Sequence, residues 1–273
     1  MSNPIFIARQ DTLENDILPA HWLSQYKLFG EESYTFQDKE IWKKLCMSRA
    51  AANDRDMHAE ALEEMLTTFS AEHTGKWMLL IYGLDAAVLE GLATMAAIAA
   101  NGTAMAAVAG NALLMHAITN SQTAMRAIAN SETAMTAVAA SSTAMTAVVA
   151  SSTAMTAVAA SATAMGKIAA VDAALSKLAA STTAMDALYA RKKQMKGGSA
   201  SKSGKFIILE ISQSNTFNTS KYGYATLSDG SKPDWSSYLA KYAFFRKYPK
   251  YATYMLNDTD SDDYIYYFDI ASP

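Results

Sequence analysis

Carboxylates near the C-terminal end of the chain have the spacing that most resembles a binding site. The acidic residues of the segment 257–263 are Asp258, Asp260, Asp262 and Asp263. Alternating carboxylates are typical of a calcium-binding loop. The segment has neither the central glycine nor the distant glutamate of such a loop. A solvated hairpin loop is therefore the favoured interpretation, and calcium binding is the alternative.

A pair of carboxylates can also hydrolyse a glycosidic bond, one acting as general acid and the other as base or nucleophile. The acids available for such a pair are Asp229, Asp234, Asp258 and Asp260. The segment that contains them, residues 205–273, is short for a glycosidase domain. We therefore expect no enzyme, with no catalytic residues, no cofactor and no metal. A small glycan-degrading domain is kept as an alternative.

Aromatic side chains in the same segment could bind a glycan or a protein partner. The candidates are Trp235, Tyr238, Tyr242, Tyr248 and Tyr251. Phe244 and Phe245 lie among them in the sequence. Aromatic rings offer a large apolar face with a polar edge, which suits both sugars and protein surfaces. The competing interpretation is that most of these rings form the core of a small domain.

The middle of the chain, residues 93–190, is a ten-residue tandem repeat. Its clearest units are SSTAMTAVVA at 141–150 and SSTAMTAVAA at 151–160. Methionine recurs at every residue number that ends in 5 from 95 to 185, except for Leu175, and a branched apolar residue follows three positions later. Ten residues at about 100° each fall roughly 80° short of three helical turns, so one straight helix is disfavoured.

Small polar residues gather where one unit joins the next, as in Asn101-Gly102, Asn120-Ser121 and Ser151-Ser152. Ser and Asn favour turns and helix N-caps. The units therefore predict a solenoid of helices of about seven residues, with a multi-chain helical rod and a β-solenoid as alternatives. A single unit cannot bury its own apolar face. If consecutive helices stack at 8–10 Å, ten units span about 80–100 Å.

The methionine column has a metal-binding interpretation as well, because thioethers are soft ligands. Methionine at helical spacing is ordinarily core, and that interpretation is favoured.

The flanks differ from the repeat in composition. Residues 1–50 suggest an extended attachment arm and 51–92 a helical cap. The Gly/Ser-rich stretch 191–204 has the composition of a flexible linker. Strand patterns at 205–211, 223–227, 251–256 and 264–270, with a short helix between 235 and 248, predict a small β-rich domain at 205–273. The fold class expected is mainly α, an elongated solenoid or rod with a helical cap and a small C-terminal α+β domain.

Charge and cysteine content exclude several classes of protein. The formal net charge is −3, which predicts no nucleic acid partner. The single cysteine, Cys46, rules out an intramolecular disulfide framework. The apolar stretch 77–100 is interrupted by Asp85 and Glu90, so no membrane span is expected. We see no apolar core of a signal peptide at residues 1–16.

The Ser-Ser-Thr-Ala-Met-Thr-Ala-Val-Ala-Ala unit resembles the alanine-rich decapeptide repeats of bacteriophage tail fibres and other virion structural proteins. The resemblance covers residues 93–190. It implies a tail fibre located in the virion, a homo-oligomer, most often a trimer, with an N-terminal part that binds other virion proteins. The C-terminal domain would contact a host surface glycan or protein for host attachment. The alternative from another class is a bacterial surface adhesin or repeat scaffold.

Overall fold

The computed structural model describes residues 92, 95–212, 222–235, 238–259 and 263–273. The chain divides into two compact units, Met1–Ala147 and Val148–Pro273, which we describe one at a time. The expected attachment arm at 1–50 lies outside the described residues, as does the expected helical cap at 51–92 apart from Leu92.

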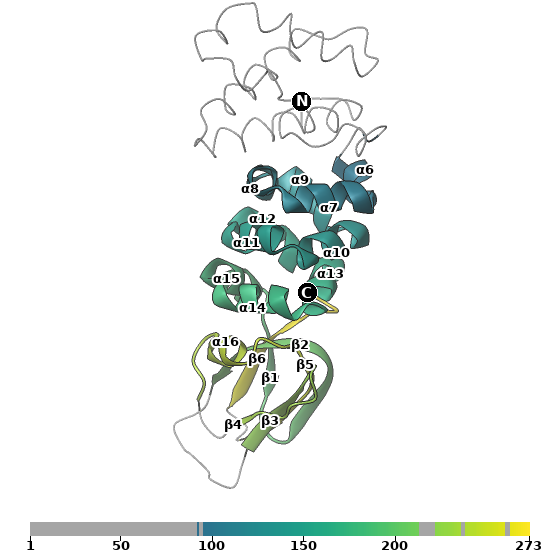
Figure 1. Cartoon of the computed structure of the whole chain (residues 1–273). Coiled ribbons are helices and arrows are strands. Elements are labelled where there is room, and N and C mark those ends of the chain that lie inside the picture. The colour runs from purple at the N-terminus through teal and green to yellow at the C-terminus, as the bar shows by residue number, and fades with distance from the viewer. Residues whose placement is uncertain (1–91, 93–94, 213–221, 236–237, 260–262) are drawn as a thin grey trace, which may run out of the picture. The chain divides into compact units, whose positions relative to one another are not determined.

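In the first unit each ten-residue repeat forms one helix (Figure 1). Separate short helices were expected, and the structure confirms them. The bend from α7 to α8 is 99° and that from α10 to α11 is 102°. The helices are α6 Met95–Ala100, α7 Gly102–Gly110, α8 Ala112–Asn120, α9 Gln122–Ala129, α10 Glu132–Ala140 and α11 Ser142–Ala150, whose last residues extend into the second unit.

The second unit continues the same pattern with four more repeat helices. They are α12 Ser152–Ala159, α13 Ala162–Ala169, α14 Asp172–Ala180 and α15 Thr182–Tyr189. From α7 on, the repeat helices have eight or nine residues rather than the expected seven. The reason is that a single residue, such as Asn111 or Ser121, serves as the C-cap of one helix and the N-cap of the next.

Most breaks are made by a polar side chain at the first position of the unit, the residue whose number ends in 1; Val171, before α14, makes no side-chain cap. Ser131 has extended backbone angles (φ −98°, ψ 119°), and its Oγ accepts a hydrogen bond from the amide of Ala134 at 3.1 Å. Asn101 caps α7 in the same way, through the amide of Ala104 at 3.0 Å. Such caps satisfy an amide that the helix itself leaves unpaired.

Burial follows the ten-residue period as closely as the helices do. The fourth, fifth, eighth and ninth residues of a unit are buried, as Ala134, Met135, Val138 and Ala139 are. The described methionines of the repeat column, from Met95 to Met185, all lie in this core. The small alanines at the fourth and ninth positions allow close approach between helices, and the flexible methionine fills the remaining space.

The helices that stack on one another are three units apart, not consecutive. In the first unit α10 packs against α7, and α9 against α6. Ser131 Oγ donates to the carbonyl of Ala99, and Ser141 Oγ donates to that of Ala109, both at 2.6 Å. The expected length of 80–100 Å, which assumed stacking between consecutive helices, is therefore wrong: the helix-packing distance of about 8–10 Å corresponds to three units.

In the second unit, too, the helices that pack on one another are three units apart. Helix α15 packs against α12, and Ser181 Oγ donates to the carbonyl of Val149 at 2.5 Å. The same hydroxyl accepts from the amide of Ala184 at 3.2 Å. One serine therefore satisfies an unpaired amide at the start of its own helix and a carbonyl near the end of an earlier helix.

The described residues after α15 form a six-stranded antiparallel sheet with one short helix, α16 Ala243–Lys247 (Figure 1). The order of strands is β1-β6-β2-β5-β3-β4. The described chain is thus a mixed α+β protein. The strands are β1 Lys193–Lys196, β2 Ala200–Ser212, β3 Tyr222–Leu227, β4 Asp234–Trp235, β5 Ala252–Asp258 and β6 Tyr264–Asp269.

The four expected strands and the expected short helix are confirmed, whereas the expected linker at 191–204 is wrong. That stretch contains β1 and the beginning of β2, which pair with β6 and β5. The glycines form the connection between the two strands: Gly197 donates its amide to the carbonyl of Asp263 at 2.8 Å, and Gly198 donates to Thr259 at 2.9 Å. Backbone hydrogen bonds therefore order a sequence whose side chains are those of a flexible segment.

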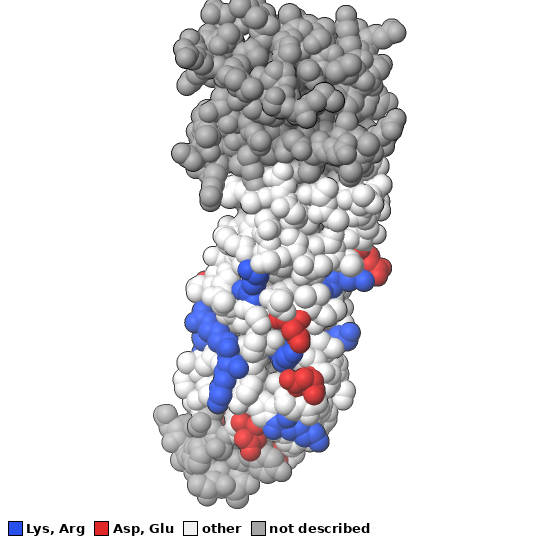
Figure 2. Space-filling view, viewed as in Figure 1, with Lys and Arg blue, Asp and Glu red and all other residues white. Residues whose placement is uncertain are grey.

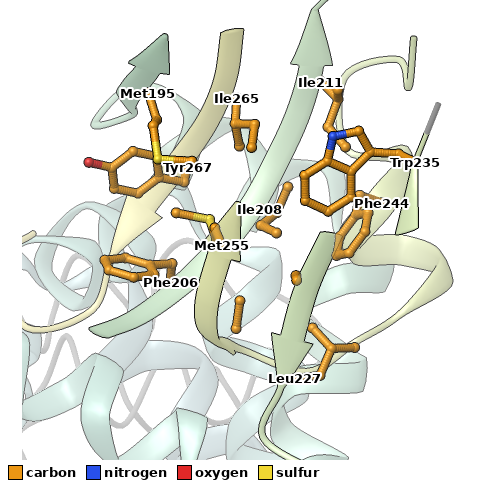
Figure 3. Packing of buried hydrophobic residues seen from close by; sticks show 12 residues of the cluster. Met195, Phe206, Ile208, Ile211, Leu227, Trp235, Phe244, Met255, Ile265 and Tyr267 are labelled. Atoms are coloured by element: carbon orange, nitrogen blue, oxygen red, sulfur yellow. The ribbon is translucent and has the colours of Figure 1, made fainter. Parts of the chain in front are cut away.

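One face of the sheet holds the core of this domain, shown in Figure 3. Two of its rings pack directly on glycines. A Cβ added to Gly223 would lie 2.3 Å from Nε1 of Trp235, its partner across the β3–β4 pair, and one added to Gly204 would lie 2.4 Å from the ring of Phe206. The core residues are Met195, Phe206, Ile208, Ile211, Ala225, Leu227, Trp235, Phe244, Ala252, Met255, Ile265 and Tyr267.

No single helix in the described parts of the chain is both long and apolar enough to cross a membrane. Two bent helix pairs meet the length and composition test only when each pair is taken together.

Replacing Ser181 by Ala should lower the free energy of unfolding of the second unit by about 1–3 kcal/mol, because both an N-cap bond and a bond to another helix are lost. Chemical denaturation followed by circular dichroism measures the change. The matched control is Ser152→Ala, at an exposed second position of a unit, where we expect a change within about 0.5 kcal/mol. Equal effects for the two variants would contradict the role assigned to the first-position serine.

Candidate functional site

The predicted aromatic residues do not form one exposed platform. Trp235 is buried, and its ring meets Phe244 edge to face at 5.6 Å (Figure 3). Tyr248 packs against the other side of this pair, 5.2 Å from Phe244. Within the described part of the chain, Nε1 of Trp235 has no hydrogen-bond partner. These rings belong to the core of the domain, which agrees with the competing interpretation from the sequence.

The other three aromatic candidates make their contacts outside the cluster of Trp235, Phe244 and Tyr248. Tyr238 is 53% exposed. Tyr251 is half-buried, and Lys205 Nζ lies 5.6 Å from its ring centroid. Tyr242 is buried and has its ring contact with Tyr189 on the last repeat helix. Of the five candidates, Tyr242 therefore leads to a different cluster, which the sequence analysis did not find.

The predicted carboxylates are also dispersed. Asp229 accepts hydrogen bonds from the amide and the hydroxyl of Ser231 at 2.9 and 2.6 Å, which lower its pKa. Asp234 is exposed on β4, and Asp258 accepts from the hydroxyl of Ser199. Asp263 is buried. Asp260 and Asp262 lie outside the described residues. Among the residues that are described, no three His, Cys, Asp or Glu side chains form a metal-binding group.

The densest polar and aromatic cluster in the described structure joins the last two repeat helices to the β domain. At its centre the hydroxyl of Tyr189, the last residue of α15, donates to Oε2 of Glu210 on β2 at 2.6 Å. The Tyr189 ring lies 5.8 Å from that of Tyr242, edge to face, and 6.5 Å from that of Tyr266 on β6. We call the cluster formed by Tyr189, Glu210, Asp186, Lys241 and Tyr242 the junction.

Asp186, one turn before the end of α15, supplies the charge at the junction. Its carboxylate accepts from the hydroxyl of Tyr242 and from Nζ of Lys241 at 3.1 Å. The hydrogen bond from Tyr242, and then that from Lys241, lower the pKa of Asp186. Burial, followed by the bond to this carboxylate, raises the pKa of Tyr242. The tyrosine therefore remains a donor and the aspartate remains a charged acceptor.

Tyr242 reaches this position through an uncommon backbone conformation. Its φ is 71°, in the left-handed region that L side chains other than those of Asn and Asp seldom occupy. The residue directly precedes α16, and its amide donates to the carbonyl of Leu209 on β2. Contacts on both sides, with the sheet and with Asp186, hold it there.

Two further contacts connect the same elements. Lys250 forms an ion pair with Asp172 of α14, and Arg246 of α16 donates to Oγ1 of Thr182 at 3.1 Å. In the clearest unit, SSTAMTAVAA, the positions of Asp172, Asp186 and Tyr189 hold Ser, Thr and Ala. The positions of Asp172 and Asp186 vary among the described units, with Glu132 and Arg126 among their residues, whereas the ninth position is mostly Ala. The departures from the repeat therefore coincide with the contacts to the β domain.

These departures were the signal that sequence reasoning missed. The ninth residue of a described unit is otherwise Ala, Thr or Val and is buried, so a tyrosine there cannot fit the repeat packing and must meet something else. The burial of Tyr189, followed by its bond to Glu210, raises the pKa of the phenol well above its ordinary value. Chemically, the arrangement is a set of permanent donors and acceptors suited to holding two elements together.

Comparison with models of known protein families, and with curated proteins, finds no match to this chain.

The junction bond from Tyr189 to Glu210 should stabilise the second unit. Tyr189→Phe keeps the ring contacts and removes the hydroxyl, which leaves a half-buried carboxylate without that donor. We expect the free energy of unfolding to fall by about 1–2 kcal/mol, typical of a hydrogen bond to a charged group. Thermal and chemical denaturation measure it, with Tyr238→Phe at an exposed ring as the control. No difference between the two variants would show that this bond adds nothing to stability.

Proposed function

We propose that this chain is a structural component of a bacteriophage virion, a tail fibre in which the repeat helices form a stacked array that carries the C-terminal domain. The observation that carries the proposal is the serine bond between units: Ser131 to Ala99, Ser141 to Ala109 and Ser181 to Val149 all join residues 32 apart. A bond repeated at a constant separation is what a regular array of units requires.

The geometry of such an array follows from the caps. A bend near 100° at a single cap residue turns the chain back over itself after three to four units. The pairs α7–α10 and α12–α15 favour three (Figure 1). In an array with this register, every three units add one ordinary helix spacing of about 8–10 Å. A long fibre would need several copies or several proteins end to end.

The surface of the repeat suits a spacer better than a binding or catalytic element. In the described repeat helices up to α13, the charged side chains are Arg126, Glu132 and Lys167. Exposed positions otherwise hold mostly Ala, Ser, Thr and Gly. On the face drawn in Figure 2, charged side chains gather over the last repeat helices and the C-terminal domain. Functional contacts would then fall to the ends of the array.

The junction supports a display role for the C-terminal domain. A terminal repeat needs a partner at its outer edge, and the domain contacts the last two repeat helices through Tyr189, Asp186 and Asp172. In the proposal, residues 1–92 attach to other virion proteins, and the C-terminal domain contacts a receptor on the host or the next fibre segment. Several copies in a homo-oligomer, such as a trimer, would strengthen weak single contacts.

The array geometry predicts how length changes with repeat number. Inserting nine more SSTAMTAVAA units after Ala160 should lengthen the particle by about 27 Å, since three units share one helix-packing distance. Small-angle X-ray scattering of the full chain and of the extended variant gives the difference. An increase near 80 Å would mean that consecutive units stack, and one near 135 Å would mean a continuous helix. Either result would reject the three-unit array.

The virion assignment has a separate test. Particles produced from the genome that encodes this chain, purified by density gradient, should contain its peptides by mass spectrometry at several copies per particle. Antibodies against the full chain should label the tail in electron micrographs. Particles that lack the chain altogether would contradict a virion role, whatever the shape of the array.

A further inference from the structure

Four tyrosine rings form a continuous string across the junction. Tyr264 and Tyr266 stack on β6, with centroids 6.3 Å apart and planes 22° from parallel. Tyr266 lies 6.5 Å from Tyr189, and Tyr189 lies 5.8 Å from Tyr242. The first three rings are half-buried, so part of each reaches solvent. The rings come from β6, α15 and the residue before α16, and the distances between successive ring centroids are nearly equal.

Three cations lie over this string. Lys192 Nζ is 4.2 Å from the centroid of Tyr189 and 5.8 Å from that of Tyr266. Lys241 Nζ is 4.4 Å from Tyr189 and 4.6 Å from Tyr242. The guanidinium of Arg246 is 5.5 Å from the ring of Tyr242. Cation–π attraction holds such groups at defined places, although all three side chains belong to exposed residues.

The charge around the string is not balanced by the nearby carboxylates. Asp186 is engaged with Tyr242 and Lys241, and Glu210 accepts from Tyr189. Residues 191–273 contain 12 Lys and Arg against 8 Asp and Glu, although the whole chain has a net charge of −3. In the described structure the side chain of Lys192 contacts rings and no carboxylate. Around the string, the three cations Lys192, Lys241 and Arg246 therefore face two carboxylates.

We infer that this string binds an acidic polysaccharide, a polymer whose carboxylate or phosphate groups recur along a sugar or polyol backbone; this rests on the receptor contact proposed above for the C-terminal domain. The anionic groups pair with the ammonium groups of Lys192 and Lys241 and with Arg246. The solvent-exposed parts of the rings of Tyr264, Tyr266 and Tyr189 contact the saccharide between them. The constant step between rings suits a polymer that repeats.

The same features argue against single-stranded nucleic acid as the ligand. Binding of that kind depends on bases that stack on open aromatic faces. Cations lie over the rings of Tyr189, Tyr242 and Tyr266, where bases would have to stack. A ligand that presents charge first, and sugar edges second, fits this surface better.

Calorimetric titration of the full chain tests the inference with three probes: polygalacturonate for carboxylates, poly(glycerol phosphate) for phosphates, and neutral dextran. We expect binding to at least one acidic polymer and none to dextran. Binding should weaken as salt rises from 20 to 200 mM, because exposed charges are screened over about 10 Å at 0.1 M salt. Whichever acidic polymer binds more tightly identifies the source of the anionic group.

Variants of Lys192 connect the binding to the string. Lys192→Gln should raise the Kd about three- to fivefold without changing the melting temperature, and Lys192→Arg should retain binding. Lys232→Gln, on the exposed turn before β4, is the matched control and should bind like the parent. Equal binding by Lys192→Gln and the parent would overturn the inference.

The inference would also fall if dextran bound as tightly as the acidic polymers, or if oligo(dT) bound more tightly than both with the same dependence on Lys192. None of these outcomes bears on the array length or on the presence of the chain in particles. A failed ligand and a failed tail-fibre assignment are therefore distinguishable.

Discussion

The structure depends on how very short helices satisfy their own ends. An α-helix leaves about four amides and four carbonyls unpaired at its termini, which for eight or nine residues is about half of its backbone groups. A serine at the first position of a unit can satisfy groups at two helix ends. The hydroxyl of Ser181 accepts from the amide of Ala184, near the start of its own helix, and donates to the carbonyl of Val149, near the end of an earlier helix. Without such bonds a chain of ten-residue helices would expose or bury many unsatisfied groups.

This constraint explains the composition of the unit. A residue that caps must be small and polar, and it must adopt extended backbone angles, which Ser and Asn do readily. The bend that it creates brings helices three units apart into contact, so the facing residues must be small. Ala134 and Ala139 supply that close approach, while Met135 and Val138 fill the interior. Little of the ten-residue sequence is left free for chemistry.

Much of this was predictable because it is local. Helix breaks follow from Ser and Asn at one unit position, and the core positions follow from the recurrence of Met and Val. The three-unit register was not predictable, because the period specifies where the chain bends but not by how much. A bend near 100° could only be measured. The length expected from consecutive stacking was wrong for that reason.

In the C-terminal domain, the sequence-based prediction was incomplete for a different reason. The strands with alternating or apolar patterns were identified, whereas β1 was missed because Lys193–Lys196 pairs through its backbone and its side chains resemble those of a linker. The aromatic residues could not be sorted from the sequence, because the burial of Trp235 depends on Gly223, which leaves room for the ring on the neighbouring strand. Neither fact is visible within a short window of sequence.

In a repetitive protein, the informative residues are those that break the repeat. Three departures in the last two units, Asp172, Asp186 and Tyr189, each contact the β domain, through Lys250, Lys241 with Tyr242, and Glu210. Most exposed positions of a unit are Ala, Ser or Thr, and of these Thr182 adds one contact by accepting from Arg246. Most of the described side-chain bonds that attach the terminal domain thus come from residues at which the last two units differ from SSTAMTAVAA. Two cations, Lys192 and Lys241, lie over the ring of Tyr189, which stands where most units have a buried alanine.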